Sequence, residues 1–222
     1  MEKESASNHQ AFRTSSATGI NRKREPFRLF FLIAATDAML GAAVWLPLAF
    51  ITETISGASA GLWHRNALLF GTVPAILAGF LLTALPRWTK QPAVSQLSMR
   101  LLAAIWLAAR GISFLSTTVG LLLAAVFVLS LTVVAARPVI TSNDRRNFKV
   151  VLLLSCFCGS VVLSAGAWHT ELALRMAIAS IIALVAIIAG RVIPALTAAY
   201  AQSIGAQLLV RPLMRVEIVA AF

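Results

Sequence analysis

The chain has 222 residues, of which 59% are hydrophobic and only 12% are charged, and its mean hydropathy is +0.85. Soluble domains carry about a quarter charged residues, so this composition excludes an ordinary soluble domain and indicates an integral membrane protein. The net charge of +11 does not indicate a nucleic-acid partner, because the basic residues flank apolar runs and do not form one surface.

The predicted elements begin with a polar, serine-rich segment over residues 1–25, which we interpret as a disordered tail. Six apolar stretches follow, each near the ~20 residues that a bilayer core requires. We therefore expect an all-α fold, with a six-helix transmembrane domain over 26–200 and a cytoplasmic or interfacial tail over 201–222. The six spans are expected at about 28–51, 62–85, 97–116, 117–138, 148–168 and 172–199.

The join between the third and fourth spans, "GISFLSTTVG", is short and weakly polar. Arg110 and the serines and threonines that follow it favour a tight hairpin over one long helix. Charge placement supports the same topology. If the N-terminus is cytoplasmic, only Arg65, Arg110 and Arg175 of the 19 lysines and arginines fall on the outer side. The positive-inside rule then predicts that both termini lie in the cytoplasm and that the number of spans is even.

Charged residues within membrane spans are costly and are usually paired or functional, and three of those in the expected spans are singled out here. Asp37 shares a helix face with Ala34 and Gly41, so we expect it to point into the bundle. We predict an intramembrane polar network of Asp37, Arg110 and Arg191, with Asp37 and Arg191 as a pair. Two alternatives stay open: Arg191 and Arg110 each extend to the nearer membrane surface, or Arg110 contacts the Trp106 ring.

Two histidines are candidate ligands. His64 begins the second span, within ~20° of Gly71 and Ala75 on the helical wheel, and so on the face that packs. His169 lies in the connection "GAWHTE", on the same outer side in the predicted topology. Imidazoles bind haem iron or copper, so we assign both as cofactor-binding candidates and His64 as the metal ligand. A hydrogen-bonded helix end is the alternative for His64.

The sequence gives little support for other metal sites or for an enzyme active site. Cys156 and Cys158 lie ~200° apart around one helix, which favours packing over a metal site. The sequence has no glycine-rich phosphate loop, no paired catalytic carboxylates and no nucleophile triad, so a classical enzyme is not predicted.

The motifs resemble those of the NnrS family, haem- and copper-containing bacterial membrane proteins linked to nitric-oxide metabolism. The resemblance covers residues 26 to about 198, and its most specific parts are the second span and the Gly-Arg-Val-Ile-Pro segment. It implies an all-helical bundle, an inner-membrane location and His64 as the most transferable haem-site residue. The matching segments are Pro26–Phe31, Trp63-His64, Phe70-Gly71, Ala78–Ala84, Pro86-x-Trp88-Thr89, Trp106-Leu107 with Arg110, Ala136–Pro138, Arg145–Asn147 and Gly190–Pro194 with Thr197.

The chain departs from the family at two points. Members typically read Trp-His-x-His-Glu-Met, whereas Asn66, Ala67 and Leu68 stand here at the second His, the Glu and the Met. The fifth span has no histidine. Members are also usually about twice this long.

Three functions remain open from the sequence. The first is an NnrS-like inner-membrane protein of the nitric-oxide response that binds haem, with copper as the other cofactor. The second is a relative without cofactor that pairs with a second copy or another membrane protein. The third is half of a small-solute transporter, suggested by the inward Asp37 and Arg191.

Overall fold

The computed structural model describes residues 26–51, 54–55, 58–167 and 170–204, and this part of the chain is almost entirely helical. The predicted tail over 1–25 and most of the tail over 201–222 lie outside the described residues. The elements are α2 (Pro26–Ile51), β1 (Thr54–Ile55), β2 (Ala58–Ser59), α3 (Ala60–Ala67), the π-helical turn η1 (Leu68–Thr72), α4 (Val73–Thr89), α5 (Gln96–Ser113), α6 (Thr117–Ser142), α7 (Arg145–Ala165) and α8 (Thr170–Ser203).

The predicted all-α class is confirmed, and a helix occupies each of the six expected positions. Segments α3, η1 and α4 run on as one 30-residue unit, Ala60–Thr89. Five of the six helices are long and apolar enough to cross a membrane. The expected third span differs, because α5 has 18 residues and carries Arg100 and Arg110 among its apolar positions. Helix α5 packs mainly against α6.

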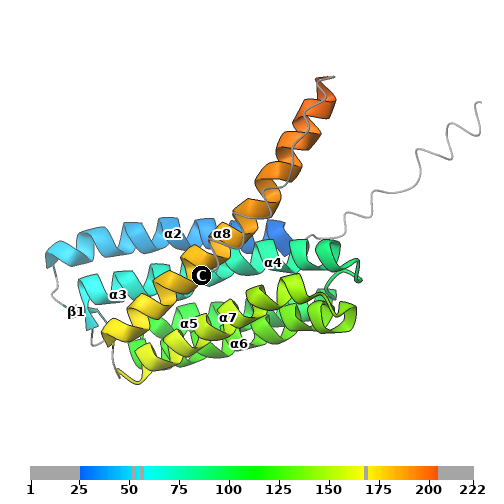
Figure 1. Cartoon of the computed structure of the whole chain (residues 1–222). Helices are drawn as coiled ribbons and strands as arrows, with labels where there is room; N and C mark the ends of the chain where they lie inside the picture. The colour runs from blue at the N-terminus through cyan, green and yellow to red at the C-terminus, as the bar shows by residue number, and fades with distance from the viewer. Residues whose placement is uncertain (1–25, 52–53, 56–57, 168–169, 205–222) are drawn as a thin grey trace, which may run out of the picture.

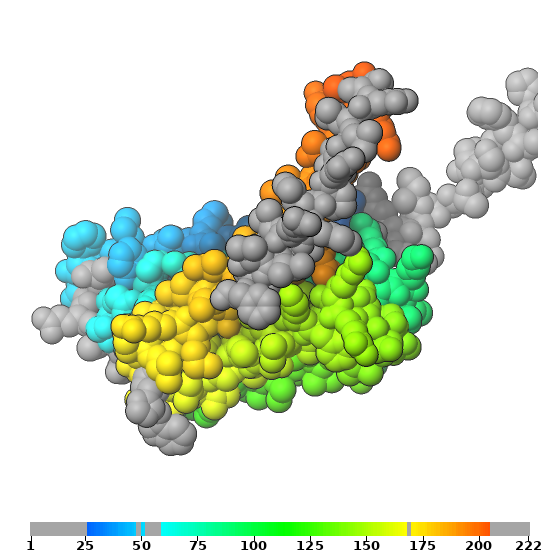
Figure 2. Space-filling view, in the orientation of Figure 1, coloured from blue at the N-terminus to red at the C-terminus, as the bar shows by residue number. Residues whose placement is uncertain are grey.

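Most helices that are neighbours in sequence also pack together, but α4 packs against α6 and not against α5. Helix α6 contacts α5 and α7, α8 packs on α7, and α2 lies along α4. The β1–β2 hairpin pairs Thr54 with Ser59 in the link from α2 to α3. Figure 1 shows α8 crossing the bundle obliquely, and the end of this helix extends beyond the other helices (Figure 2). Residues Ile193, Leu196 and Tyr200 on that half are more than 60% exposed.

Small residues line the faces on which the helices pack, as the sequence predicts. Ala34 on α2 and Ala75 on α4 are buried. Gly79 lies so close to α2 that a Cβ atom there would be 2.9 Å from the Phe31 ring. Without a hydrophobic force between helices in lipid, such close approach is what gives a membrane bundle its packing energy.

The predicted tight hairpin between the third and fourth helices is confirmed. Helix α5 ends at Ser113 and α6 begins at Thr117. The Ser116 side chain accepts a hydrogen bond from the Val119 amide and so caps α6. Gly120 faces Ser113 so closely that an added Cβ would lie 2.7 Å from the Ser113 Cα.

This contact predicts the effect of a side chain at Gly120. We expect Gly120→Ala to destabilise the detergent-purified protein by about 1–3 kcal/mol, because the backbone of α5 must move away from α6. Thermal unfolding measures the change. The control is Gly159→Ala in α7, where a Cβ meets nothing within 4 Å. Equal stability of the two variants would contradict the prediction.

Candidate functional site

The second transmembrane unit contains a π-helical turn at its centre. The amide of Val73 bonds the Leu68 carbonyl, five residues earlier, at the end of η1. Pro74 follows directly, and a proline has no amide hydrogen and its ring clashes with the carbonyl four residues before it. The wider turn accommodates the proline without a break in the helix. Single π turns of this kind are frequent at functional sites.

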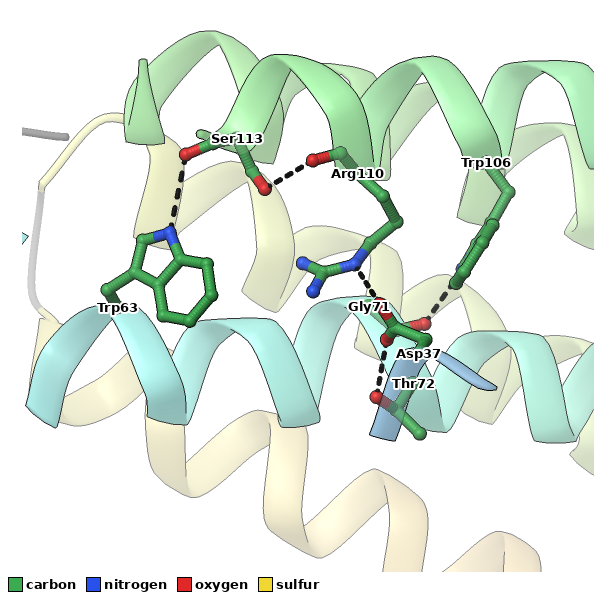
Figure 3. Close-up of polar contacts among 7 residues, drawn as sticks. All are labelled: Asp37, Trp63, Gly71, Thr72, Trp106, Arg110 and Ser113. Carbon is green, nitrogen blue, oxygen red and sulfur yellow. Dashed lines mark hydrogen bonds and ion pairs between the residues drawn. The ribbon is translucent and has the colours of Figure 1, made fainter. Parts of the chain in front are cut away.

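A buried ion pair lies beside this turn. Arg110 Nε of α5 is 2.7 Å from Asp37 Oδ1 of α2, and the two side chains are only 12% and 10% exposed. The other carboxylate oxygen, Oδ2, accepts a hydrogen bond of 2.6 Å from the Thr72 hydroxyl of η1 (Figure 3). Three segments far apart in sequence therefore meet at one carboxylate.

Tryptophans complete the polar contacts around the pair. Trp106 Nε1 donates a 2.9 Å hydrogen bond to the Gly71 carbonyl in η1. Trp63 Nε1 reaches the Ser113 carbonyl at 3.4 Å (Figure 3). Gly71 is close to the Arg110 side chain, since an added Cβ would be 3.0 Å from it. The irregular turn thus presents backbone and side-chain groups to α5.

A small cavity of about 30 Å³ adjoins the Arg110 guanidinium. Its polar walls are Arg110, Asn66, Ser113 and Thr117, and the remainder is aromatic or made of small residues. A water molecule needs about 10–15 Å³ and two to four polar partners, so the cavity suits water. It is too small for a haem, and a haem bound at His64 would lie outside it.

We predicted that Asp37 and Arg191 pair or share a polar network that includes Arg110. In the structure the two carboxylate oxygens of Asp37 contact Arg110 and Thr72. Arg191 of α8 instead donates to the Asn147 side-chain oxygen and to the Arg146 carbonyl, at 3.0 Å for the latter. Its guanidinium also lies 4.8 Å from the centre of the Trp88 ring.

His64 lies at the start of the second unit, on α3. Its ring stacks on Trp45 of α2 with centroids 4.2 Å apart and planes 20° apart. His64 Nδ1, Trp45 Nε1 and Arg65 Nε are buried and have no hydrogen-bond partner. Buried polar atoms are rarely left unpaired, so three of them on adjacent or stacked residues mark this end of the bundle as a place where a ligand would supply partners.

Of the other sequence candidates, the structure describes the cysteines but not the second histidine. His169 lies outside the described residues. The Cys158 thiol is buried and reaches the Ala125 carbonyl at 3.7 Å, so it packs α7 against α6. Within the described ranges, no group of three or more His, Cys, Asp or Glu side chains is close enough to hold a metal ion.

Comparison with models of known protein families assigns the chain to a family. The family model described as NnrS protein matches residues 23–222. The chain belongs to the NnrS family. No curated protein and no solved structure matches it.

The residues after His64 differ from the His-Glu-Met that we expect in the NnrS family. Asn66 and Ala67, at the family's second His and Glu positions, are 9% and 5% exposed and line the small cavity. Leu68, at the Met position, begins the π turn. In this NnrS protein Ala67 therefore packs in the bundle, and Asn66 places its side-chain amide at the small cavity.

Sequence reasoning missed Thr72, Asn66 and the Trp106–Gly71 hydrogen bond. The one available signal was Pro74, which predicts a distortion one turn earlier and so free backbone groups near residue 70. Nothing in the sequence identified α5 as the neighbour of η1.

The Asp37–Arg110 pair should contribute much more to the stability of this NnrS protein than an exposed ion pair does. We expect Asp37→Asn or Arg110→Gln to cost about 3–5 kcal/mol, because each leaves an uncompensated buried charge. The double variant should lose less than the sum of the single losses. Thermal unfolding of purified protein measures both.

The matched control is the Glu171–Arg175 pair of α8, 2.9 Å apart but with side chains 70% and 76% exposed. Exposed pairs contribute little, so Glu171→Gln should leave the unfolding temperature unchanged. Additive losses in the Asp37 and Arg110 double variant would show that the two residues do not stabilise one another.

Proposed function

We propose that this NnrS-family protein acts in the response of a bacterial cell to nitric oxide, from the inner membrane, and holds haem through His64. Family membership over residues 23–222 supports the nitric-oxide role. The observation that carries the haem assignment is the buried His64 Nδ1 without a hydrogen-bond partner.

The residues at this end of the bundle fit a haem. A haem iron already has four porphyrin nitrogens and needs only one or two axial protein ligands, so a single histidine suffices. Arg65 Nε is a buried cationic donor without a partner, and Trp45 Nε1 is a neutral one. Such donors suit the two carboxylates of a haem, since charge-assisted hydrogen bonds to carboxylates are the strong ones.

The protein's own contribution is to orient and desolvate His64. Stacking on Trp45 at 4.2 Å fixes the plane of the imidazole. The Ser59 cap, whose hydroxyl accepts from the Leu62 amide, fixes the start of α3 at Ala60, in the turn before His64. A bound haem supplies binding of nitric oxide and one-electron chemistry.

Copper does not fit the described residues in the same way. Protein copper sites draw several ligands from histidine, cysteine and methionine. Within the described part of the chain, no group of three or more His, Cys, Asp or Glu side chains could hold a metal ion, so we propose no copper site among these residues.

A second function is favoured by the altered motif. Asn66 and Ala67 are buried in the helix core and leave His64 as the one imidazole of α3. A chain that keeps the NnrS fold without cofactor would serve as a membrane partner, either of a second copy or of another membrane protein. The absorption spectrum separates the two proposals.

The haem proposal predicts a Soret band in the detergent-purified full chain. We expect His64→Ala to lose most of this absorption at equal protein concentration, because the iron loses its axial ligand. His9→Ala, at the N-terminal segment, is the matched control and should keep it. Wild-type protein at normal levels with no such band would favour the cofactor-free relative.

The nitric-oxide role predicts a growth phenotype that does not depend on the spectrum. Cells lacking the gene should grow more slowly than wild type under a nitric-oxide donor and equally without it. A wild-type copy should restore growth. Equal growth of deleted and wild-type cells at all donor concentrations would contradict the role, whatever the haem content.

A further inference from the structure

The π turn of the second transmembrane unit separates two side chains that a continuous α-helix would place on one face. Residues seven apart in an α-helix lie within about 20° of one another, so the sequence predicts a shared face for His64 and Gly71. Gly71 faces α5, since an added Cβ there would be 3.0 Å from the Arg110 side chain. His64 is instead directed to α2, where its ring stacks on Trp45 with centroids 4.2 Å apart. The direction of His64 therefore does not follow from a continuous helix.

The extra residue of the π turn accounts for this difference. At the end of η1 the Val73 amide bonds a carbonyl five residues back, where an α-helix would use the carbonyl four residues back. One added residue turns the preceding helix by about 100° around its axis. Trp63 then shares a face with Gly71. Its ring nitrogen does reach the Ser113 carbonyl of α5 (Figure 3), which leaves His64 to face α2.

Two hydrogen bonds from other helices hold the π turn. Trp106 Nε1 of α5 donates to the Gly71 carbonyl at 2.9 Å. The Thr72 hydroxyl donates to Asp37 Oδ2 of α2 at 2.6 Å. Trp106 and Thr72 are only 4% and 7% exposed, so water competes little for either bond. Successive residues of η1 are thus tied to two different helices, and a return to an α-helical turn would have to break these ties or rotate α3.

We propose that Trp106 and Thr72 are positioning residues for His64. They hold the π turn, the π turn sets the rotation of α3, and this rotation brings the imidazole to Trp45. Pro74 acts in the same direction, because in an α-helical turn its ring would clash with the carbonyl four residues earlier. The effect on a cofactor rests on the haem function proposed above, whereas the effect on the direction of the imidazole does not.

Cysteine cross-linking in membranes measures the rotation of α3 without any cofactor. The starting protein is the full chain with Cys156→Ala and Cys158→Ala. One variant then carries Trp45→Cys with His64→Cys, and another carries His64→Cys with Ser113→Cys. A short bifunctional thiol reagent should join positions 45 and 64 of α2 and α3. It should leave positions 64 and 113 unjoined, because position 64 does not face α5.

Loss of either hydrogen bond should change the ratio of the two cross-linked products. Trp106→Phe keeps an aromatic ring and Thr72→Val keeps the branched shape, but each removes a donor. Each should lower the ratio of the 45–64 product to the 64–113 product roughly fivefold, the equivalent of one hydrogen bond. The two changes lie in different helices, so either one carries the test if the other variant fails to accumulate.

Two further variants are the controls. Thr72→Ser keeps the hydroxyl and should keep the wild-type ratio. Thr132→Val makes the same chemical change at a buried threonine of α6, whose hydroxyl bonds the Val128 carbonyl of its own helix, and should also keep it. An unchanged ratio in Trp106→Phe and Thr72→Val would overturn the proposal.

The absorption spectrum of the purified full chain tests the effect on the cofactor. Trp106→Phe and Thr72→Val should lower the Soret absorption at equal protein concentration, and Thr72→Ser and Thr132→Val should keep it. A changed cross-linking ratio with an unchanged Soret band would show that the rotation of α3 does not matter to the haem, and would overturn the positioning role. A wild-type chain without a Soret band would contradict the haem function alone, because the cross-linking still decides what Trp106 and Thr72 do.

Discussion

The ion pair between Asp37 and Arg110 is the interaction on which the arrangement of the first three helices depends. A lone carboxylate in the core of a bilayer costs several kcal/mol, so α2 requires a partner for Asp37 within the bundle. Arg110 reaches it at 2.7 Å, and Thr72 satisfies the second oxygen. This contact fixes the rotation of α2 and α5 around the second transmembrane unit, and the π turn at Leu68–Thr72 places Thr72 where it can donate.

The two ends of the bundle have different chemistry. At the end that holds α3, three polar atoms of Trp45, His64 and Arg65 are buried without hydrogen-bond partners, and it is to this end that we assign the proposed haem. At the other end, the Arg28 and Arg191 guanidiniums lie over the Phe27 and Trp88 rings. The central ion pair separates the two. A defect at Asp37 should therefore disturb the packing of the whole bundle, whereas a change at His64 should act on one end.

Much of the fold could be predicted because the requirements of a lipid bilayer apply to each helix separately. Each helix must satisfy its own backbone in lipid, so length and apolar content identify it without knowledge of its neighbours. The face containing Ala34 and the face containing Gly71, Ala75 and Gly79 were also readable, since small residues at helical spacing mark close packing. The weak point was α5, whose arginines and short length make it less apolar than the five candidate spans.

The sequence by itself determined the helical class, the NnrS resemblance, the tight turn after Ser113 and the inward direction of Asp37. Only the tertiary structure decided that Asp37 pairs with Arg110, that Arg191 holds α7 through Asn147, and that Asn66 lines a small cavity. The physical reason is that helix periodicity gives the direction of a side chain around its own axis. It carries no information on which helix lies opposite, because that choice depends on the packing of all the helices together.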